Sequence, residues 1–594
     1  MRQRLQKTFL YWRTARHLKP SQLFWRLRYR LGSGRTPRYT APDPLPSMDE
    51  RVAERLRGLA VHWAEAAPPD AARVRSFLLG RFTFINKTVQ SARPLWRGLD
   101  VPRLWAYHLH YFDYGREIAL RHPDHASEEA ATLRLWMDDW MAKNPRGTSP
   151  AWDAFPLSAR LINWSMIAAV YGWRDFGLVS SLHEQLDYLA GHLERELLGN
   201  HLLKNAAALT VAGTLLNSPR AEEGLALLEA QVRSQFLPDG GHIERSPMYH
   251  AFALMDLLFA CAVLEPRPSW LEDGVARGLA FLQGITHEDG HLAQFNDGAA
   301  DEGPSGVALY ALGSYFDPDL APAPGGSAAF PDSGLYRLEP GNLGGLMLVK
   351  AGHSTVNYQP GHAHSDLLSF EYSLRGERLL VNSGTHGYAE SPCRPYCRSC
   401  AAHNSLQING EEQLEHWSTF RVGRRIHGEV VAWDPREPSL RAAYTTRRGT
   451  RHERLFAWDS GGWCRVQDKI SGKGPLAVET FLHFHPDCRV EAIEDRPCSG
   501  VYRPYRLTTG SQILQLLIFG AHDVVQHRGT VPLGPGWFFP RFGEAVAADT
   551  LVAHSCGNME MTISFVIAPC DEHGIPPEII QNFLSAWHPR NGNS

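Results

Sequence analysis

Several histidines are concentrated in one Gly-rich part of the second half of the chain. His362 and His364 lie in the run Gly-His-Ala-His-Ser-Asp, and His403 follows in His-Asn-Ser. An imidazole can accept or donate a proton near neutral pH, and it is also a common metal ligand. If the run is an extended strand, its alternate residues His362, His364 and Asp366 share one face. We therefore predict a catalytic or metal site here, although any single His could instead be a core or turn residue.

Two polar segments in the first half of the chain add groups suited to proton transfer. Asn200 and His201 precede an Ala- and Leu-rich run, where Asn200 could equally be a helix N-cap. Further on, the dipeptide Ser246-Pro247 is typical of a helix start, so Tyr249 is expected in the first helical turn. A Tyr hydroxyl can act as a general acid, and as a base only where nearby positive groups lower its pKa.

The elements that must position these residues change from helical to β-rich near the middle of the chain. Apolar residues recur at three- and four-residue intervals from about 50 to 320, which predicts consecutive helical hairpins. Beyond about 330, short Val-, Ile-, Thr- and aromatic-rich segments are divided by Gly, Asn and Asp turns, which predicts an antiparallel β-sandwich. The individual helices are expected near 128–142, 156–172, 177–197, 201–216, 220–235, 247–264 and 270–285.

The length of 594 residues is too great for one hydrophobic core. We predict a basic extension and linker over 1–45, a helical domain over 46–325 and a β domain over 326–594, with linkers in the Pro- and Gly-rich stretches 33–46 and 321–326. A net charge of −3 gives no global field that would require a nucleic acid partner. Nine scattered cysteines are an odd number, which argues against a disulfide scaffold.

The first 35 residues carry ten Lys or Arg and no acidic residue, interleaved with aromatic and Leu residues at roughly helical spacing. Such a segment could lie on an anionic membrane surface or on a partner, or it could simply cap the first domain. We see no signal-peptide pattern and no apolar run long enough to span a membrane. We expect a cytoplasmic or membrane-peripheral protein, with periplasmic and extracellular locations left open.

Taken together, these segments resemble the heparinase II/III-like polysaccharide lyases, which include heparin, heparan-sulfate and alginate lyases. The resemblance covers most of residues 80–590 and implies an incomplete (α/α) toroid followed by an antiparallel β-sandwich, with a cleft between them. The motifs that carry it are Asn200-His201, Ser246-x-x-Tyr249-His250, His362-x-His364-x-Asp366, Gly384-Thr385-x-x-Tyr388 and Arg398-Ser399-x-x-x-His403-Asn404, with weaker similarities at 152–160 and in Phe295-Asn296-Asp297.

The resemblance implies β-elimination at a 4-O-linked uronic acid, in which the C5 proton leaves and the C4–O bond breaks. Asn200 and His201 would neutralise the uronate carboxylate, where charge develops. Tyr249 would be the acid, and for one C5 epimer also the base, whereas His362 would be the base for the other epimer. Tyr388 is a further catalytic candidate. The substrate-binding residues implied are Arg245, His250 and Asn205.

A structural Zn²⁺ is the cofactor that the resemblance implies, without any organic cofactor. Its ligands would be His364, His403 and the residue at position 382. Relatives have an aspartate at that position, but this chain has Asn382, whose neutral carbonyl oxygen is a poorer zinc ligand. Asp366 could compensate, or it could orient a histidine by accepting its N–H.

Two other functions remain open from the sequence alone. An α/α-toroid glycoside hydrolase would need a pair of carboxylates, for which the nominees are Asp239, Glu244 and Asp297. A non-catalytic or biosynthesis-associated polysaccharide-binding factor would explain the basic N-terminal segment and Asn382. If the chain is a lyase, its anionic substrate could be a glycosaminoglycan such as heparan sulfate, alginate or a bacterial surface polysaccharide.

Overall fold

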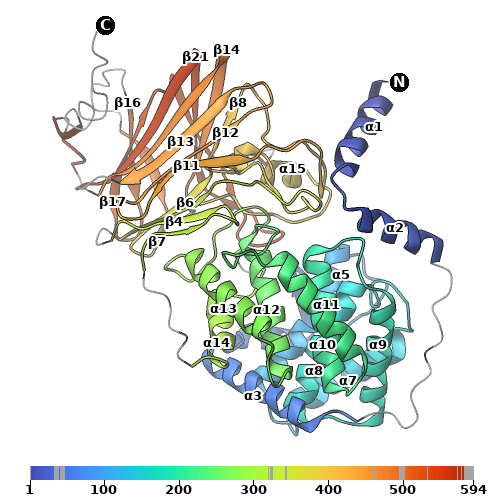
Figure 1. The fold of residues 1–594 in the computed structure, drawn as a ribbon. Coiled ribbons are helices and arrows are strands. Elements are labelled where there is room, and N and C mark those ends of the chain that lie inside the picture. Colours follow the sequence, from blue (N-terminus) through green and yellow to red (C-terminus); the bar gives the residue numbers. More distant parts are fainter. Residues whose placement is uncertain are drawn as a thin grey trace.

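The computed structural model consists of a helical domain, a β domain and two N-terminal helices beside them (Figure 1). It describes the whole chain except residues 1, 33–38, 40–46, 301, 319, 321–324, 342–343, 459–461, 494–501, 531–532, 572, 577 and 581–594. Much of both predicted linkers lies outside the described residues. The last helix of the helical domain ends at Ser314, and the first strand of the β domain begins at Ala328.

Side-chain caps begin many of the helices in the first domain. Asp49, Asp70, Ser127 and Asp175 each accept the backbone N–H of the residue three positions later, which pairs one of the free donors of a first turn. The helices are α3 Glu50–Ala66, α4 Ala71–Leu78, α5 Arg103–Tyr111, α6 Asp113–Arg121, α7 Glu128–Lys143, α8 Ala154–Tyr171, α9 Phe176–Gly191, α10 Gly199–Leu215, α11 Arg220–Gln235, α12 Pro247–Val263, α13 Ser269–Gly284 and α14 Gly306–Ser314.

Helices α8, α10 and α12 lie at the centre of this domain because their sequences are apolar on nearly every side. Almost all of their residues are buried, and α10 packs on both of the others. Outer helices such as α7 and α11 bury only one stripe. A small hairpin, β1 Arg81–Phe84 and β2 Lys87–Gln90, connects α4 to α5. The first turns of α10 and α12 therefore stand on a rigid support.

The β domain consists mainly of two antiparallel sheets that share a hydrophobic core. One sheet runs in the order β3-β4-β5-β6-β7, and the other contains the long paired strands β14 and β21. Met347 and Phe370 of the first sheet belong to one buried cluster with Phe456 and Leu516 of the second. The strands of the first sheet are β3 Ala328–Phe330, β4 Leu335–Leu338, β5 Gly345–Lys350, β6 Phe370–Leu374 and β7 Glu377–Leu380.

The second sheet runs in the order β11-β12-β13-β14-β21-β17-β16-β15, with β8 paired to β14 and β18 to β21. Its strands are β8 Leu406–Ile408, β11 Gly428–Asp434, β12 Ser439–Thr445, β13 Arg451–Trp458, β14 Cys464–His483, β15 Arg489–Ala492, β16 Tyr502–Thr508, β17 Ile513–Phe519, β18 Asp523–Arg528 and β21 Asp549–Pro569. Outside the sheets are two short strand pairs and two short helices: β9 His416–Ser418, β10 Arg421–Val422, β19 Trp537–Phe538, β20 Val546–Ala547, α15 Cys393–Cys397 and η2 Cys400–Ala402.

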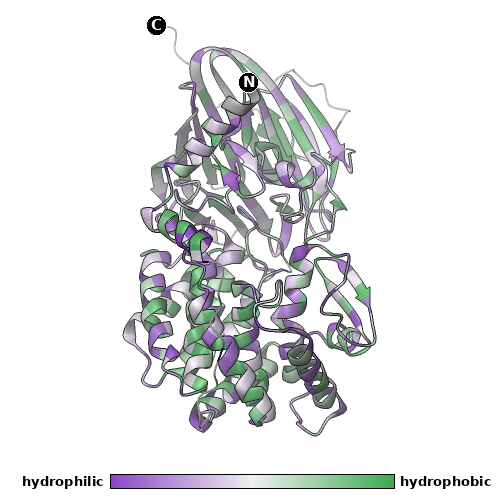
Figure 2. Cartoon of the chain, turned by 90° about the vertical axis from the view of Figure 1, so that its right-hand side faces the viewer, coloured by the Kyte–Doolittle hydropathy of each residue, from purple (hydrophilic) through white to green (hydrophobic). Residues whose placement is uncertain are grey.

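The N-terminal helices α1 Arg2–Ala15 and α2 Pro20–Gly32 connect the two domains from outside (Figure 1). Arg13 of α1 pairs with Glu415 of the β domain at 2.6 Å, whereas Gln22 of α2 donates to the carbonyl oxygen of Glu196 in the helical domain. In the view of Figure 2, α1 lies in front of the β domain. No helix in the described part of the chain is both long enough and apolar enough to cross a membrane.

The helix predictions agree with the structure, apart from their ends. The helix predicted over 177–197 ends at Gly191, and residues 192–198 form a turn that leads into α10. The extended conformation considered for 361–366 is wrong, because these residues form turns in the connection between β5 and β6. His362 and His364 nevertheless both bond to Asp297. The turn, and not the alternation of side chains along a strand, brings the two histidines together.

Candidate active site

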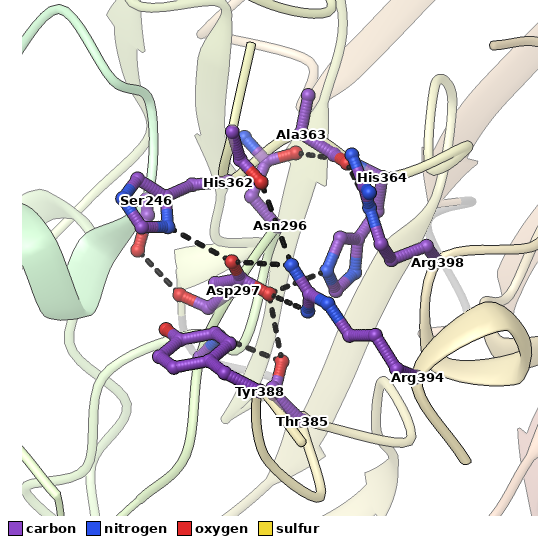
Figure 3. A network of polar contacts seen from close by, with 12 residues as sticks. Ser246, Asn296, Asp297, His362, Ala363, His364, Thr385, Tyr388, Arg394 and Arg398 are labelled. Atoms are coloured by element: carbon purple, nitrogen blue, oxygen red, sulfur yellow. Dashed lines mark hydrogen bonds and ion pairs between the residues drawn. The ribbon is translucent and has the colours of Figure 1, made fainter. Parts of the chain in front are cut away.

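Asp297 is the centre of a buried polar network between the two domains (Figure 3). Its carboxylate accepts from His362 Nδ1 and His364 Nε2, each at 2.8 Å, and from both terminal nitrogens of Arg394. Burial opposes the ionisation of Asp297, but Arg394 and the two imidazoles outweigh it and hold the pKa of this carboxyl well below its usual range. Asp297 is therefore an anion that orients both histidines.

The hydrogen bond to Asp297 fixes the protonation pattern of His362. An ionised carboxylate only accepts, so Nδ1 of His362 must carry the hydrogen. In the neutral ring, Nε2 is then left with a lone pair. Nε2 lies 3.9 Å from Oε2 of Glu244, and the ring is 9% exposed. His362 consequently presents a basic nitrogen at the edge of the buried network.

Two tyrosines stand beside the His362 ring. The ring of Tyr249, in the first turn of α12, stacks on His362 with a centroid distance of 3.7 Å. Its hydroxyl lies 2.9 Å from the hydroxyl of Tyr388. Burial, followed by the nearby Asp297 carboxylate, raises the pKa of both phenols. In the structure Tyr249 is thus a protonated donor, and the positive neighbours expected to lower its pKa do not outweigh its burial.

Tyr388 is held by both aromatic and cationic contacts. The guanidinium of Arg394 lies 5.0 Å from its ring centroid, and the rings of Phe420 and Phe542 lie 5.2 and 5.1 Å away. These contacts are those of an aromatic side chain packed in a turn. The hydroxyl contact with Tyr249 shows in addition that Tyr388 reaches the predicted site.

Asn200 and Glu244 form the helical-domain side of the site. The backbone N–H and the Nδ2 of Asn200 both donate to the Glu244 carboxylate, at 3.1 and 2.8 Å. The N-cap alternative for Asn200 is wrong, because Leu198 is the cap residue of α10 and Asn200 is inside its first turn. Burial raises the pKa of Glu244, but His362, His242 and the bonds from Asn200 outweigh it, so the pKa is lowered.

His201 is a second imidazole on the helical side. Its Nδ1 bonds to Oε1 of Glu194 at 2.8 Å, and its ring packs on Phe155 at 4.9 Å. Burial lowers the pKa of His201, but Glu194 outweighs that effect and the pKa is raised. Asn205 binds both the backbone N–H and the carboxylate of Glu194, at 2.8 and 3.1 Å. Asn205 therefore positions Glu194, and through it the imidazolium of His201.

The three predicted substrate-binding residues do not line the site in the way expected. Asn205 is fully buried behind Glu194. His250 is buried in the helical core, where it bonds to the Gly278 carbonyl oxygen at 3.0 Å and packs on Phe281. Arg245 donates to the carbonyl oxygen of Asp332 at 2.8 Å. A helix places successive residues on different sides, so the motif that carries Tyr249 into the site turns His250 into the core.

The predicted metal ligands lie together but are already engaged. His364 and His403 have ring centroids 5.3 Å apart, and one nitrogen of each, His364 Nδ1 and His403 Nε2, is buried without a hydrogen-bond partner. The carbonyl oxygen of Asn382 contacts His403 Nδ1 at 3.1 Å and accepts from Ser369 at 2.8 Å. Only the two imidazole nitrogens are thus available to a cation.

A lysine next to this pair already supplies a positive charge. Lys350 Nζ is bonded to the Asp366 carboxylate and, at 2.5 Å, to Oδ1 of Asn296. Asp366 is thus committed to Lys350 and does not replace the missing aspartate. Among the described residues, no three His, Cys, Asp or Glu side chains converge as a metal site. Two imidazoles and an amide next to an ammonium group do not fit the three or four protein ligands that zinc requires.

Three functional candidates escaped the sequence-based assignment of the site. Glu244 was considered only as a hydrolase carboxylate, Asp297 appeared also in a weak family similarity but without a role in a lyase, and Arg394 was not considered at all. The Phe295-Asn296-Asp297 similarity was a usable signal for Asp297, and the segment before Ser246 was a usable signal for Glu244. Nothing in the sequence marks Arg394, since its pairing with Asp297 spans 97 residues.

Comparison with known proteins agrees with this architecture. A curated heparin-sulfate lyase of Pedobacter heparinus is 24% identical over 454 residues, which are 67% of this chain and 65% of that protein, just under two thirds of its length. A solved mutant of heparan sulfate lyase HepC from Pedobacter heparinus matches with a TM-score of 0.60 and 17% identity, covering 88% of this chain and 87% of that one. A solved heparinase III structure matches with a TM-score of 0.66 and 15% identity, covering 94% and 92%.

Two models of one family match separate parts of the chain. The heparinase II/III N-terminus model matches residues 105–267, within the helical domain. The heparinase II/III-like, C-terminal model matches residues 322–566, which span the β domain. Together they account for more than half of the chain, and both Tyr249 and His362 lie within them. The chain belongs to the heparinase II/III-like family.

Proposed function

We propose that this protein is a polysaccharide lyase that cleaves 4-O-linked uronic-acid polysaccharides by β-elimination. The observation that carries the proposal is the packing of the His362 imidazole ring on the phenol ring of Tyr249. His362 is oriented by Asp297 and stacks on Tyr249. Burial raises the pKa of the Tyr249 phenol and so keeps it neutral. A base and an acid side by side are what removal of the C5 proton and protonation of the leaving O4 require. The names of the related lyases support the same activity.

The proton transfers of the proposed reaction balance with these side chains and water. His362 Nε2 takes the C5 proton, and the electron pair of that C–H bond becomes the C4–C5 double bond while the C4–O bond breaks. The leaving oxygen takes the proton of Tyr249. The proton on His362 then returns to the Tyr249 phenolate through solvent. Tyr388 donates to Tyr249 in this scheme and stabilises the phenolate, because the two hydroxyls lie 2.9 Å apart.

The uronate carboxylate must be neutralised before C5 becomes acidic enough to lose its proton. We assign this role to His201 and Asn200. With its Nδ1 bonded to Glu194, the charged ring of His201 keeps Nε2–H as a second donor. Asn200 Nδ2 gives one hydrogen to Glu244 and retains another. Both donors come from the first turn of α10, whose free backbone N–H groups also favour an anion.

For the overall fold, we propose that the helices form an incomplete (α/α) toroid and that the two sheets form a β-sandwich.

For the substrate, we propose a glycosaminoglycan of the heparan sulfate type, since the related lyases carry that name. Alginate and bacterial surface polysaccharides are the alternatives that an assay separates. A structural zinc ion stays a prediction from the family resemblance, and the ligands present do not favour it.

The hydrolase alternative lacks a free pair of carboxylates. Asp297 is enclosed by Arg394 and two histidines, and Asp239 is bonded to the backbone N–H and the hydroxyl of Ser333, at 2.7 and 2.8 Å. Of the three nominees, only Glu244 faces the site. Inversion or retention at a sugar needs two carboxylates on opposite sides of the bond, so elimination is the better supported reaction.

The test is the ultraviolet absorbance of the conjugated double bond, followed with heparan sulfate, chondroitin sulfate, hyaluronan, alginate and polyglucuronate. We expect a rise with at least one polymer and a fall of about 10²- to 10⁴-fold in Tyr249→Phe, because general acid catalysis contributes that much. Tyr310→Phe is the matched control, since that hydroxyl only donates to the Leu279 carbonyl oxygen. Release of reducing ends without absorbance would contradict the proposal and favour a hydrolase.

A further inference from the structure

Positively charged and imidazole side chains from distant parts of the chain gather near the junction of the two domains. One segment, 352–354, pairs with 426–428, because Gly428 N–H donates to the Gly352 carbonyl oxygen at 2.6 Å. The turn between α1 and α2 reaches this pair, because Thr14 Oγ1 and Arg425 Nη2 both donate to the Val422 carbonyl oxygen, each at 3.3 Å. Arg245 reaches it through the neighbouring hairpin, because Arg245 donates to the Asp332 carbonyl oxygen and Ala351 N–H donates to the Gly334 carbonyl oxygen. We call the group the cationic rim cluster, and its members are Arg16, His17, Arg245, His353, Arg425 and His427.

Two pairs of members of the cationic rim cluster are in contact. The rings of His353 and His427 are 5.0 Å apart in an edge-to-face arrangement. Arg16 Nε lies 3.2 Å from His17 Nε2. Ser354 donates to the Ile426 carbonyl oxygen at 2.7 Å, which fixes the two segments that carry the paired rings. Backbone pairing therefore holds His353 and His427 in place, and α1 brings a further cation to them.

The donors of this cluster are poorly satisfied within the described protein. Arg425 Nη2 contacts only the Val422 carbonyl oxygen, at 3.3 Å, and its Nε and Nη1 are buried without a partner. Arg245 Nε and His427 Nδ1 are likewise buried without a partner. Of the described acidic side chains, none forms an ion pair with any of the six members. Asp239 and Asp332 act to raise the pKa of Arg245, but burial outweighs them and the pKa is lowered.

Burial and repulsion between neighbouring members lower the pKa values of several side chains in the cluster. Burial and then Arg16 lower the pKa of Arg425 to about 10. Burial, followed by Arg425 and Arg16, lowers the pKa of His17 to about 4. Burial and the neighbouring His353, Arg245 and Arg425 lower the pKa of His427. A buried cation without a partner is costly, so an anion that reaches the unpartnered Nε and Nη1 of Arg425 would be bound there.

We propose that the cationic rim cluster binds sulfate or carboxylate groups of an anionic polysaccharide whose chain extends out of the active site. The inference rests on the proposed function for the identity of that chain. Arg245 directly follows Glu244, whose carboxylate is 3.9 Å from His362 Nε2. His353 lies in the segment that leads to His362. Guanidinium groups match planar and tetrahedral oxyanions with two parallel hydrogen bonds.

Helices α1 and α2 bring two members of the cluster, Arg16 and His17, to the junction of the two domains. Arg16 and His17 are held there because α1 is anchored to Glu415 of the β domain and α2 to the helical domain. Between them, Lys19 lies 3.8 Å above the ring of Tyr358 in the segment that also carries His353. The basic N-terminal helices thus contribute to an oxyanion site at the domain junction.

The first experiment measures binding, so that it does not depend on cleavage. A fluorescently labelled heparan sulfate oligosaccharide is titrated into the full chain carrying Tyr249→Phe. Adding Arg425→Gln is expected to weaken binding about tenfold or more, since one bond between charged groups contributes that much. Arg425→Lys, which keeps the charge, is expected to lose less. Arg436→Gln is the matched control, because Arg436 is an exposed arginine on the turn between β11 and β12.

Thermal unfolding of each variant separates a lost contact from a lost fold. Equal affinities for Arg425→Gln and Arg436→Gln, in variants that remain folded, would overturn the proposal. So would binding to phosphatidylserine vesicles that depends on Arg425, in the absence of oligosaccharide binding, because the cluster would then face a membrane. If no polymer gives a double bond but oligosaccharide binding still depends on Arg425, the proposed lyase activity fails and the rim site stands.

Discussion

Two regions of the molecule contain nearly the same side chains and differ in what they can do. In the candidate active site, Asp297 holds His362 and Arg394. In the core of the β domain, Asp468 holds His452 at 2.6 Å and Arg454 at 2.6 and 2.8 Å. A tyrosine ring contacts the histidine in both clusters, Tyr249 in the first and Tyr444 in the second. The composition of a carboxylate, imidazole and guanidinium cluster therefore does not identify a catalytic site.

What separates the two clusters is access to a free nitrogen. His452 is completely buried between strands, and its second nitrogen has no partner and no path to solvent. His362 stands at the edge of its network, where Nε2 faces Glu244 and the ring stacks on the Tyr249 phenol. The Asp468 cluster acts in folding, because it joins β13 to β14 and to the backbone of Leu368 and Asn404. The Asp297 cluster adds a partly exposed edge to the same kind of support.

The sharpest way to break this comparison is the same substitution in each cluster. Asp297→Asn should lower the rate of double-bond formation by about 10²- to 10⁴-fold, because the amide no longer fixes the hydrogen on His362 Nδ1. Asp468→Asn should leave the rate per folded molecule close to that of the wild type. Steady-state ultraviolet assays on both variants measure the two effects. Equal losses in the two variants would show that the two clusters play the same part.

The stability of the same variants gives the next largest effect. Asp468→Asn leaves Arg454 buried without its counter-ion, which should lower the free energy of unfolding by about 3–5 kcal/mol. Urea unfolding followed by circular dichroism measures it. The control is Asp523→Asn, a change of the same type at an exposed residue of β18, which should change stability by less than about 0.5 kcal/mol.

Acid sensitivity sharpens the assignment of Asp468. Burial raises the pKa of this carboxyl, but Arg454 and His452 outweigh it and lower the pKa to about 2. A carboxyl whose pKa is lower in the folded state stabilises the fold above its unfolded pKa, near 4, and loses this contribution as the pH falls toward 2. Between these limits the change is about 2 kcal/mol. Unfolding free energies measured across this range should decline less in Asp468→Asn than in the wild type.

Metal removal should have the smallest effect. Lys350 already pairs with Asp366, and Asn382 is bonded to Ser369 and His403, so little of the fold depends on zinc. We expect less than one zinc per molecule by elemental analysis, and no change in melting temperature after dialysis against a chelator. Stoichiometric zinc together with a lower melting temperature in the chelator would restore the family's metal site.

The sequence predicted the elements better than the contacts between them. Helix starts such as Ser246-Pro247 depend on neighbouring residues only, and Ser246 does cap α12. Short motifs surround Tyr249 and His362, so the sequence could nominate both, and the structure brings their rings together. The bond between Asp297 and His362 could not be predicted, because it joins residues 65 positions apart and no local pattern reports that distance. The burial of His250 could not be predicted either, because it depends on the packing of neighbouring helices.

The most direct test of the central claim is chemical rescue of the proposed base. The absorbance of the double bond would be followed in wild type and in His362→Ala, with and without added imidazole, and with His522→Ala as an exposed-histidine control. The account predicts that His362→Ala loses nearly all activity and that imidazole restores part of it, because the small base fills the space beside Tyr249. A His362→Ala variant that works at the wild-type rate would contradict the account.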